Sequence, residues 1–519
     1  MPIFDFHIHP SLKELLAPEE ARLSPWSKIE AKLKIGKLFG QETQIGINSL
    51  FNHTLNSQAN LSQLQQAGVN LAGIVLYSIE KNIARGVLER KVASNGRINP
   101  LDPAVLISIR DTPSYYSWLC KNIDSLLKHS DSEGGKARFR FINSINEYQP
   151  DATNIVHGIC MIEGIHCLMD DPDAPDAEES LFRNLADFQQ RYKTKIFAIN
   201  LAHMQAMPFF THAFGIQFIK DELFYPKGNG ITQAGKRIVK ELYKQNILTD
   251  LKHLSFVARQ QLIELHKYSY PGIPLICTHA AFTGISSRNR YAQLYEKPVE
   301  RMGVWEIRHV KRRGHLSNSA FNHSSINLYD EEVIDILRSG GLIGLSLDQR
   351  ILGYPAEIIG YQWNIFPTDH EYISAEEALA FFQPYTDPSN VPIIRDPESA
   401  QTGEEIQAQE PITSEIHYSY FLNQLIHFLH IVKQAGIPFN KAIGQICIGS
   451  DFDGLINPID CCNNATEMPE FQYEIYRRLK RGRKIWKESG IAKKEVDIEQ
   501  LVDGLFYSNA LHFLQNHFK

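Results

Sequence analysis

Eight short apolar runs constrain the fold of this chain more than any other feature of its sequence. Each run is continuous rather than alternating, which is typical of parallel strands that are buried on both faces. Segments of helical character lie between most of the runs. The runs cover residues 3–9, 71–78, 156–163, 195–202, 247–253, 274–279, 342–347 and 445–451.

The clearest helical segments are 235–245, 255–266 and 331–337, where apolar residues recur at helical spacing. Strand and helix therefore alternate eight times along the chain. This alternation predicts the α/β class and a (β/α)8 TIM barrel rather than an open doubly wound sheet. The sequence contains no GxGxxG, GxxxxGKS or GxxxxGKT fingerprint, so a nucleotide-binding sheet is disfavoured.

We expect residues 1–519 to form a single barrel domain with large insertions after strands. A length of 519 residues is long for one ordinary domain, but a barrel with insertions can reach it. The insertions cover roughly residues 79–154, 289–327 and 353–414. The third is rich in proline and acidic residues, and a lid, an oligomer contact and a partly mobile loop are all compatible with it.

Charge and hydropathy disfavour nucleic-acid and membrane partners. The net charge of −6 leaves no strong basic field for nucleic acid, and the basic run at 477–484 is typical of a solvated helix face. No apolar run approaches the roughly 18–20 residues of a membrane span. The N-terminus lacks the features of a secretory signal. The seven cysteines form no CxxC pair, so we expect free thiols and a cytoplasmic location.

Imidazole and carboxylate side chains occur at the ends of six of the expected strands. In a barrel these carboxyl ends meet on one face, where barrel enzymes place catalysis. We therefore expect these side chains to lie together. They are His7 and His9, Glu163, His203, His253, His279 and Asp451, the last followed by Phe452-Asp453-Gly454.

These residue types suit a metal centre. His7 and His9 are two apart on a strand, so both point the same way, and neutral imidazoles bind zinc and similar metals. Glu163 can bridge two ions, and His253 and His279 can supply the second. A metal lowers the pKa of bound water to about 7, which makes hydroxide available. Asp451 can take up and pass on the proton, so the pattern predicts a metal-dependent hydrolase.

Each feature also has an ordinary interpretation. A single HxH pair occurs by chance, a histidine at a strand end is often only hydrogen-bonded, and Asp451 with Gly454 could form a simple turn. The coincidence at six strand ends favours the metal site over these alternatives.

Three segments resemble the membrane (renal) dipeptidases, peptidase family M19, within the amidohydrolase-like barrels. GITQAGKRIVKELYKQNILTDLKHLS at 230–255 is similar to the family pattern that ends in D-L-S-H-x-S. PLICTHAAFTGISSRN at 274–289 is similar to the pattern P-V-I-x-S-H that ends in R-N, and IGSDFDG at 448–454 matches the final-strand signature. EG at Glu163 and LAH at 201–203 stand where the family has E-G and L-T-H.

The resemblance implies a binuclear, zinc-dependent dipeptidase that uses a metal-bridging hydroxide. It implies that Asp451 manages the proton of the bridging water and of the leaving amine. His203 binds the substrate and polarises its carbonyl. Arg288 binds the substrate carboxylate, with Arg290 as the alternative. The implied ligands of two divalent metal ions are His7 and His9 for one, His253 and His279 for the other, and Glu163 between them.

The chain departs from the family pattern at several positions. His9 replaces the aspartate of the usual H-x-D, and Lys252 replaces the small residue of D-L-S-H. Ordinary amidohydrolases use H-x-H, so an amidohydrolase acting on a cyclic amide or lactone is one alternative. A catalytically silent barrel that binds a ligand or partner is another. The expected partner is a dipeptide or other small molecule, and a homodimer stays open.

Overall fold

The computed structural model describes most of the chain. The described residues are 2–30, 32–33, 54–85, 98–99, 102–215, 222–294, 296–309, 314–317, 319–353, 370–393 and 414–519.

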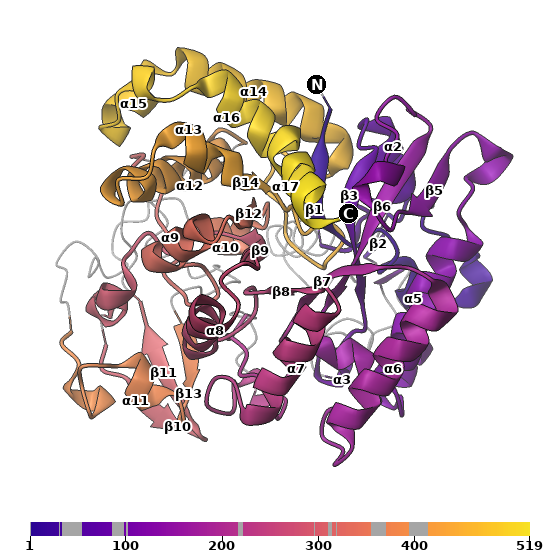
Figure 1. Cartoon of the computed structure of the whole chain (residues 1–519), viewed down its shortest axis with the longest axis horizontal. Helices are drawn as coiled ribbons and strands as arrows, with labels where there is room; N and C mark the ends of the chain where they lie inside the picture. The colour runs from indigo at the N-terminus through magenta and orange to yellow at the C-terminus, as the bar shows by residue number, and fades with distance from the viewer. Residues whose placement is uncertain are drawn as a thin grey trace.

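Eight parallel strands form a barrel, and helices surround it (Figure 1). Each strand falls on one of the apolar runs, so the predicted (β/α)8 fold is confirmed. The ring closes where Ile8 bridges Phe452 in parallel and the Asp451 amide donates to the His7 carbonyl at 2.9 Å. In order around the ring, the strands are β1 (Phe4–Ile8), β3 (Leu71–Tyr77), β6 (Ile155–Glu163), β7 (Ile196–Asn200), β8 (Leu248–Asp250), β9 (Ile276–Ala280), β12 (Leu342–Leu345) and β14 (Ile446–Ile448).

The apolar runs become strands because both of their faces are buried. On β3, Ala72, Ile74 and Leu76 pack outward, in the same hydrophobic cluster as residues of the surrounding helices. Leu71 and Val75 pack in the barrel interior. The outer helices include α5 (Tyr115–Lys128), α6 (Ala177–Tyr192), α7 (Gln233–Lys244), α8 (Phe256–Ser269), α9 (Asp330–Arg338), α12 (Ser414–Gln434) and α14 (Met468–Arg481). The three expected helices lie within or overlap α7, α8 and α9.

The last helix, α17 (Asn509–His517), closes the end of the barrel where the strands begin. The ring of Phe513 lies 6.3 Å from that of Phe6 and 6.2 Å from that of Phe197, both edge-on. Functional groups are therefore confined to the opposite end, where the strands finish.

The first insertion adds a ninth strand. β5 (Arg138–Phe141) pairs in parallel with the start of β6, outside the ring. It carries part of the basic stretch at 134–141, whose arginines alternate with Phe139 and Phe141.

The second and third insertions share one small sheet. β10 (Val299–Arg301), β11 (Val304–Arg308) and β13 (His370–Ser374) pair antiparallel, so segments more than 60 residues apart in sequence meet beside α8. The acidic stretch at 394–413 and residues 354–369 of the third insertion lie outside the described residues. The division into a single domain stays a prediction.

All seven cysteines are free thiols, and six of them are buried. No helix in the part of the chain that the structure describes has both the length and the apolarity of a membrane span.

Candidate metal centre

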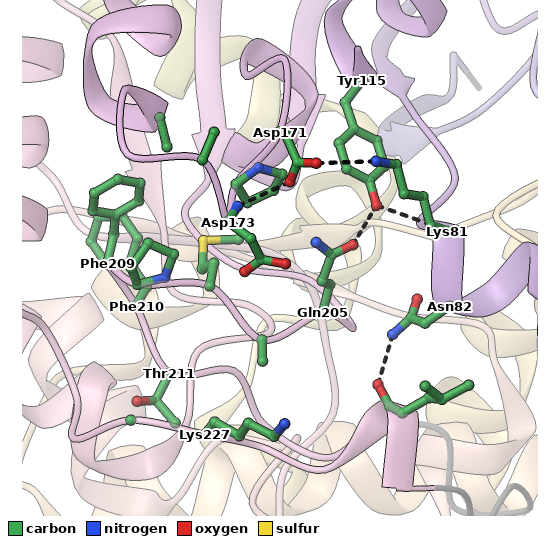
Figure 2. A pocket seen from close by; sticks show the side chains of 18 of the residues that line it. Lys81, Asn82, Tyr115, Asp171, Asp173, Gln205, Phe209, Phe210, Thr211 and Lys227 are labelled. Carbon is green, nitrogen blue, oxygen red and sulfur yellow. Dashed lines mark hydrogen bonds and ion pairs between the residues drawn. The ribbon is translucent and has the colours of Figure 1, made fainter. Parts of the chain in front are cut away.

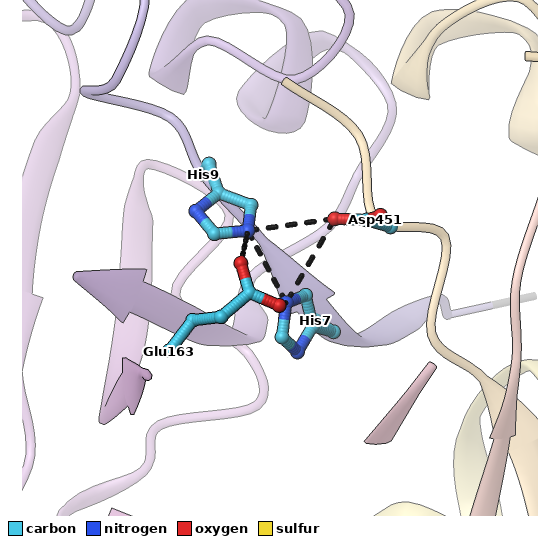
Figure 3. A group of neighbouring side chains, drawn as sticks. All are labelled: His7, His9, Glu163 and Asp451. Carbon is cyan, nitrogen blue, oxygen red and sulfur yellow. Dashed lines mark hydrogen bonds and ion pairs between the residues drawn. The ribbon is translucent and has the colours of Figure 1, made fainter. Parts of the chain in front are cut away.

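A cluster of buried imidazoles and carboxylates lies at the carboxyl ends of the strands (Figure 3). His7 and His9 project from β1 toward Glu163, which ends β6. His9 Nε2 lies 3.2 Å from Glu163 Oε2 and 3.4 Å from Asp451 Oδ1. His7 Nε2 lies 3.5 Å from Glu163 Oε1, and 3.2 Å from His9 Nε2. These four side chains enclose one point with nitrogen and oxygen atoms of ligand type.

A second group of imidazoles meets the same Glu163 carboxylate, next to His7. His253 Nε2 lies 3.1 Å from Glu163 Oε1 and 3.0 Å from His279 Nε2. His279 Nε2 is 3.4 Å from Glu163 Oε1, and His203 Nε2 is 3.8 Å from Glu163 Oε2. Glu163 therefore stands between two sets of imidazoles.

The spacing of these atoms fits bound metal ions. Two nitrogens held by one zinc ion at about 2.0–2.1 Å, with about 90–110° between them, lie roughly 2.9–3.4 Å apart. The His7–His9 and His253–His279 nitrogen pairs are 3.2 and 3.0 Å apart. Imidazoles with one carboxylate between them also match the ligand preference of zinc.

The charges of the cluster favour a cation. Burial lowers the pKa of His9, but hydrogen bonds to Asp451 and Glu163 outweigh burial and raise that pKa to about 9. Burial also raises the pKa of Asp451, and the Glu163 charge raises it further. Burial raises the pKa of Glu163, yet nearby His203 and His7 bring it well below its ordinary value. The two carboxylates thus favour positive charge at His9, between them.

A threonine and an aspartate orient His7. Thr278 Oγ1 donates a hydrogen bond to Asp250 Oδ2, so its oxygen can accept one from His7 Nδ1 at 2.8 Å. This arrangement places the proton of His7 on Nδ1 and leaves Nε2 free to face the cluster.

Backbone conformation aims Asp451 and His253 inward. Both residues have positive φ, 65° and 68°, which is uncommon for residues other than glycine and recurs at functional sites. A Cβ at Gly454 would lie 2.2 Å from Asp451 Oδ1, so a glycine is required beneath this carboxylate.

Asp453, in the same loop, stabilises the loop instead of facing the cluster. It accepts hydrogen bonds from the Gln58 and Ala59 amides, each at 2.8 Å, and pairs with Lys13 at 2.8 Å. It therefore fixes the loop, while Asp451 alone faces the cluster.

Glu80, just past the end of β3, is a site residue that the sequence analysis did not identify. Its Oε1 accepts a hydrogen bond from His203 Nδ1 at 2.6 Å, and its other oxygen accepts one from the Tyr77 hydroxyl. Burial raises the pKa of Glu80, but the charges of His203 and His166, with the hydrogen bonds from His203 and Tyr77, together outweigh burial and the pKa falls to about 2. Burial likewise lowers the pKa of His203, and the nearby carboxylates, Glu80 foremost, together reverse this. The position of Glu80 just after an expected strand was the sequence signal that could have identified it.

Neither predicted arginine forms a hydrogen bond or ion pair with the cluster among the described residues. Arg288 is exposed on the turn η8 (Ser287–Gln293), and no hydrogen bond or ion pair among the described residues joins its guanidinium to the site. Arg290 is buried, and its guanidinium donates to the Phe381 and Ser287 carbonyls at 2.5 Å. The other seven predicted site residues lie together: His7, His9, Glu163, His203, His253, His279 and Asp451.

A cavity of about 1060 Å³ is lined by residues that follow Glu80 and His203 in the sequence (Figure 2). Its wall includes Lys81 and Gln205, close in sequence to Glu80 and His203. The Tyr115 hydroxyl links the two, because it accepts from the Lys81 amide at 3.0 Å and donates to Gln205 Oε1 at 2.5 Å. Phe209, Phe210 and other apolar side chains line the cavity beside residues of both charges.

Comparison with known proteins identifies a family for part of the chain. Residues 175–294 match the sequence model of the membrane dipeptidases, peptidase family M19. The matched segment carries His203, His253 and His279, so the resemblance is confirmed there. No curated protein matches the chain.

Several solved structures resemble this one. A metallopeptidase from Rhodobacter sphaeroides, liganded with a phosphinate mimic of the dipeptide L-Ala-D-Ala, is 16% identical with a TM-score of 0.48, covering 100% of this chain and 99% of that one. Dipeptidase AC, a metallopeptidase of family M19, is 14% identical with a TM-score of 0.46 and the same coverage. The probable dipeptidase PvdM from Pseudomonas aeruginosa is 13% identical with a TM-score of 0.47, covering 88% of each chain.

Proposed function

We propose that the protein is a binuclear metal-dependent hydrolase that cleaves the amide bond of dipeptides. The convergence of four imidazoles on the Glu163 carboxylate carries this proposal. The match of residues 175–294 to the M19 family supports it. We also propose a cytoplasmic location, which the seven free cysteines support.

Two ions would share the Glu163 carboxylate. His7 and His9 would hold one and His253 and His279 the other, and zinc suits this donor set. When bound, the ions supply a water of lowered pKa and polarise the substrate carbonyl.

His203 would stabilise the negative charge that develops on the substrate carbonyl oxygen. Glu80 fixes the ring through Nδ1, so Nε2 is presented toward Glu163 and the cluster. The raised pKa of His203 keeps a proton on Nε2, and this N–H can donate to the oxygen.

Asp451 would move the proton between the attacking water and the leaving amine. Its side chain is 15% exposed, whereas that of Glu163 is 4% exposed, so Asp451 is the carboxylate that a substrate can reach. Burial raises its pKa, which suits a group that accepts a proton and then releases it.

One observation favours a second candidate. Arg288 is exposed and makes no bond to the cluster among the described residues, and His9 gives the H-x-H of ordinary amidohydrolases. A cyclic amide or lactone, which needs no carboxylate-binding arginine, is therefore the alternative substrate class.

The test is the Asp451→Asn variant, assayed with L-Ala-D-Ala beside a panel of lactones and hydantoins. We expect turnover to fall by roughly 10²–10⁴-fold. Elemental analysis should still find about two metal ions per chain, because Glu163 would be shared by two ions. Asp131→Asn, at an exposed position, is the matched control and should keep full activity. Normal turnover in Asp451→Asn would refute the proton-transfer role, and one ion per chain in the unaltered protein would refute the binuclear site.

A further inference from the structure

Lys252 is a buried lysine beside the metal centre that the proposed chemistry does not use. It lies between Asp250, which ends β8, and His253, and it is 3% exposed. Its backbone amide donates to Asp250 Oδ1 at 2.9 Å. Its Nζ has one hydrogen-bond acceptor among the described residues, the Ile326 carbonyl, at the long distance of 3.4 Å.

Two other buried cations, Lys13 and Arg259, are paired with carboxylates. Lys13 Nζ lies 2.8 Å from Asp453 Oδ1, and Arg259 forms two bonds to Glu332 at 2.8 and 3.0 Å. Lys252 Nζ, by contrast, forms no ion pair with any carboxylate in the described part of the chain. A buried ammonium with one weak acceptor is costly, since it gives up its hydration without an opposite charge. An arriving anion would remove this cost.

Lys252 follows β8, at the carboxyl end of the barrel strands. Burial is the largest influence on the pKa of Lys252 and lowers it, and the charges of Cys277, Asp451 and Asp348 oppose this only in part. Its charge in turn lowers the pKa of His253 and of His279. Lys252 is therefore within electrostatic reach of both the proton-transfer carboxylate and the second imidazole pair.

The neighbours of Lys252 reach across to the His203 side. A Cβ on Gly215 would lie 3.4 Å from Met204 Cε and 3.7 Å from Ile326 Cδ1. The loop that contacts the Lys252 amine therefore approaches the residue that follows His203.

We propose that Lys252 binds the C-terminal carboxylate of the dipeptide, the role that the family resemblance assigns to Arg288. This inference rests on the proposed function. An ammonium group has three donors, of which Ile326 takes one, so two remain for carboxylate oxygens. Arg288, exposed and unconnected to the cluster, is not needed for this contact.

The experiment compares Lys252→Met with the unaltered metal-loaded enzyme on L-Ala-D-Ala and on its C-terminal amide. We expect Lys252→Met to raise KM for the dipeptide about 10- to 100-fold, the range of a charged hydrogen bond. We expect kcat to stay within about twofold, and the amide, which lacks the carboxylate, to show no change. Lys252→Arg should keep the preference for the free carboxylate. Lys267→Met, on exposed α8 surface, is the matched control and should behave like the unaltered enzyme.

A second readout does not depend on turnover. In an Asp451→Asn background, calorimetry should show that Lys252→Met weakens the binding of L-Ala-D-Ala by the same factor. Lys252→Met should also unfold at the same or a higher temperature, because an unpaired buried charge is removed. A lower midpoint would indicate a structural lysine and overturn the proposal.

Three other outcomes are decisive. An unchanged KM for the dipeptide, or an equal loss on dipeptide and amide, would overturn the role of Lys252. A KM increase in Arg288→Met without one in Lys252→Met would return the role to Arg288. If the unaltered metal-loaded enzyme hydrolyses neither substrate, the proposed dipeptidase function fails, independently of Lys252.

Discussion

Glu14, in the loop after β1, is a buried carboxyl group whose protonation couples stability to pH. It is 8% exposed, and its Oε1 accepts a hydrogen bond from Ser125 on α5. Its Oε2 has no hydrogen-bond partner among the described residues. Burial raises the pKa of Glu14 from 4.5 to about 8, and the Ser125 bond only partly opposes this. The folded chain therefore keeps a proton that the unfolded chain releases at a lower pH.

This difference has a definite sign. Between about pH 4.5 and 8 the folded state binds more protons at Glu14 than the unfolded state, so stability falls as pH rises. At about 1.4 kcal/mol per pH unit, the loss is at most about 5 kcal/mol. We expect Glu14→Gln, which cannot ionise, to lose less stability than the unaltered protein between pH 5 and pH 8.

Thermal unfolding midpoints of both proteins at the two pH values measure this effect. Glu133→Gln, at an exposed position, is the control and should keep the pH dependence of the unaltered chain. Parallel pH profiles for Glu14→Gln and the unaltered protein would contradict the raised pKa.

Single residues also show which parts of the site were predictable. His7, Glu163 and Asp451 could be predicted because each lies at or near the end of an expected strand, and all barrel strands end on one face. Glu80 also follows an expected strand, but its role was not identified because only the folded loop shows that it bonds His203. The arginine could not be placed either, because the path of the chain after β9 is set by contacts such as those of Arg290 with Phe381.

At the scale of elements, three register shifts separate the observed strands from their sequence pattern. Asp5 pairs with Ala72 and Ile8 with Ile74, so β1 takes three steps where β3 takes two. The extra residue reverses the alternation, so that Phe4 and Phe6 face the interior at one end and His7 and His9 at the other. β9 gains a residue against β12 between Cys277 and Ala280, just where His279 stands, and β7 gains one against β6.

Such bulges re-aim side chains beside active sites, and they depend on neighbouring strands. A run such as IFDFHIH predicts a buried strand, but nothing in it specifies the extra residue. The small sheet of β10, β11 and β13 was unpredictable for a related reason, since its pairing joins two insertions separated by α9 and β12.

The helix α17 provides an element-scale prediction. Phe513 is 5% exposed and packs edge-on against Phe6 and Phe197 at the closed end of the barrel. We expect Phe513→Ala to cost about 3–5 kcal/mol, from lost burial and the remaining cavity. A lowered thermal midpoint with unchanged metal content would show that α17 stabilises the barrel without shaping the site.

The control for this variant is Tyr268→Ala on α8, whose side chain is 73% exposed. Its effect should stay within about 0.5 kcal/mol. Equal midpoints for Phe513→Ala and Tyr268→Ala would contradict a role of α17 in closing the barrel.

At the scale of the whole molecule, the metal centre exists only when the barrel is closed. Its predicted ligands come from four strands that span more than 270 residues of sequence, and the amide of Asp451 bonds the His7 carbonyl at the closing seam. The unfolded chain holds no such arrangement. Metal ions should therefore bind the folded state far more tightly than the unfolded state, and their binding free energy adds to stability.

We consequently expect metal removal to destabilise the whole chain. At a free metal concentration 1,000 times the Kd, each ion contributes about 4 kcal/mol. Removal also leaves Glu163 and Asp451 facing each other across the cluster without a cation between them, apart from protons on the imidazoles. Dialysis against a chelator should lower the thermal midpoint by several degrees, and added Zn²⁺ should restore it. A His7→Ala, His253→Ala double variant removes one ligand from each ion and should be insensitive to chelator. The prediction is contradicted if the unaltered protein contains two ions per chain but has the same unfolding temperature with and without chelator. The ions would then not link the strands of the closed barrel.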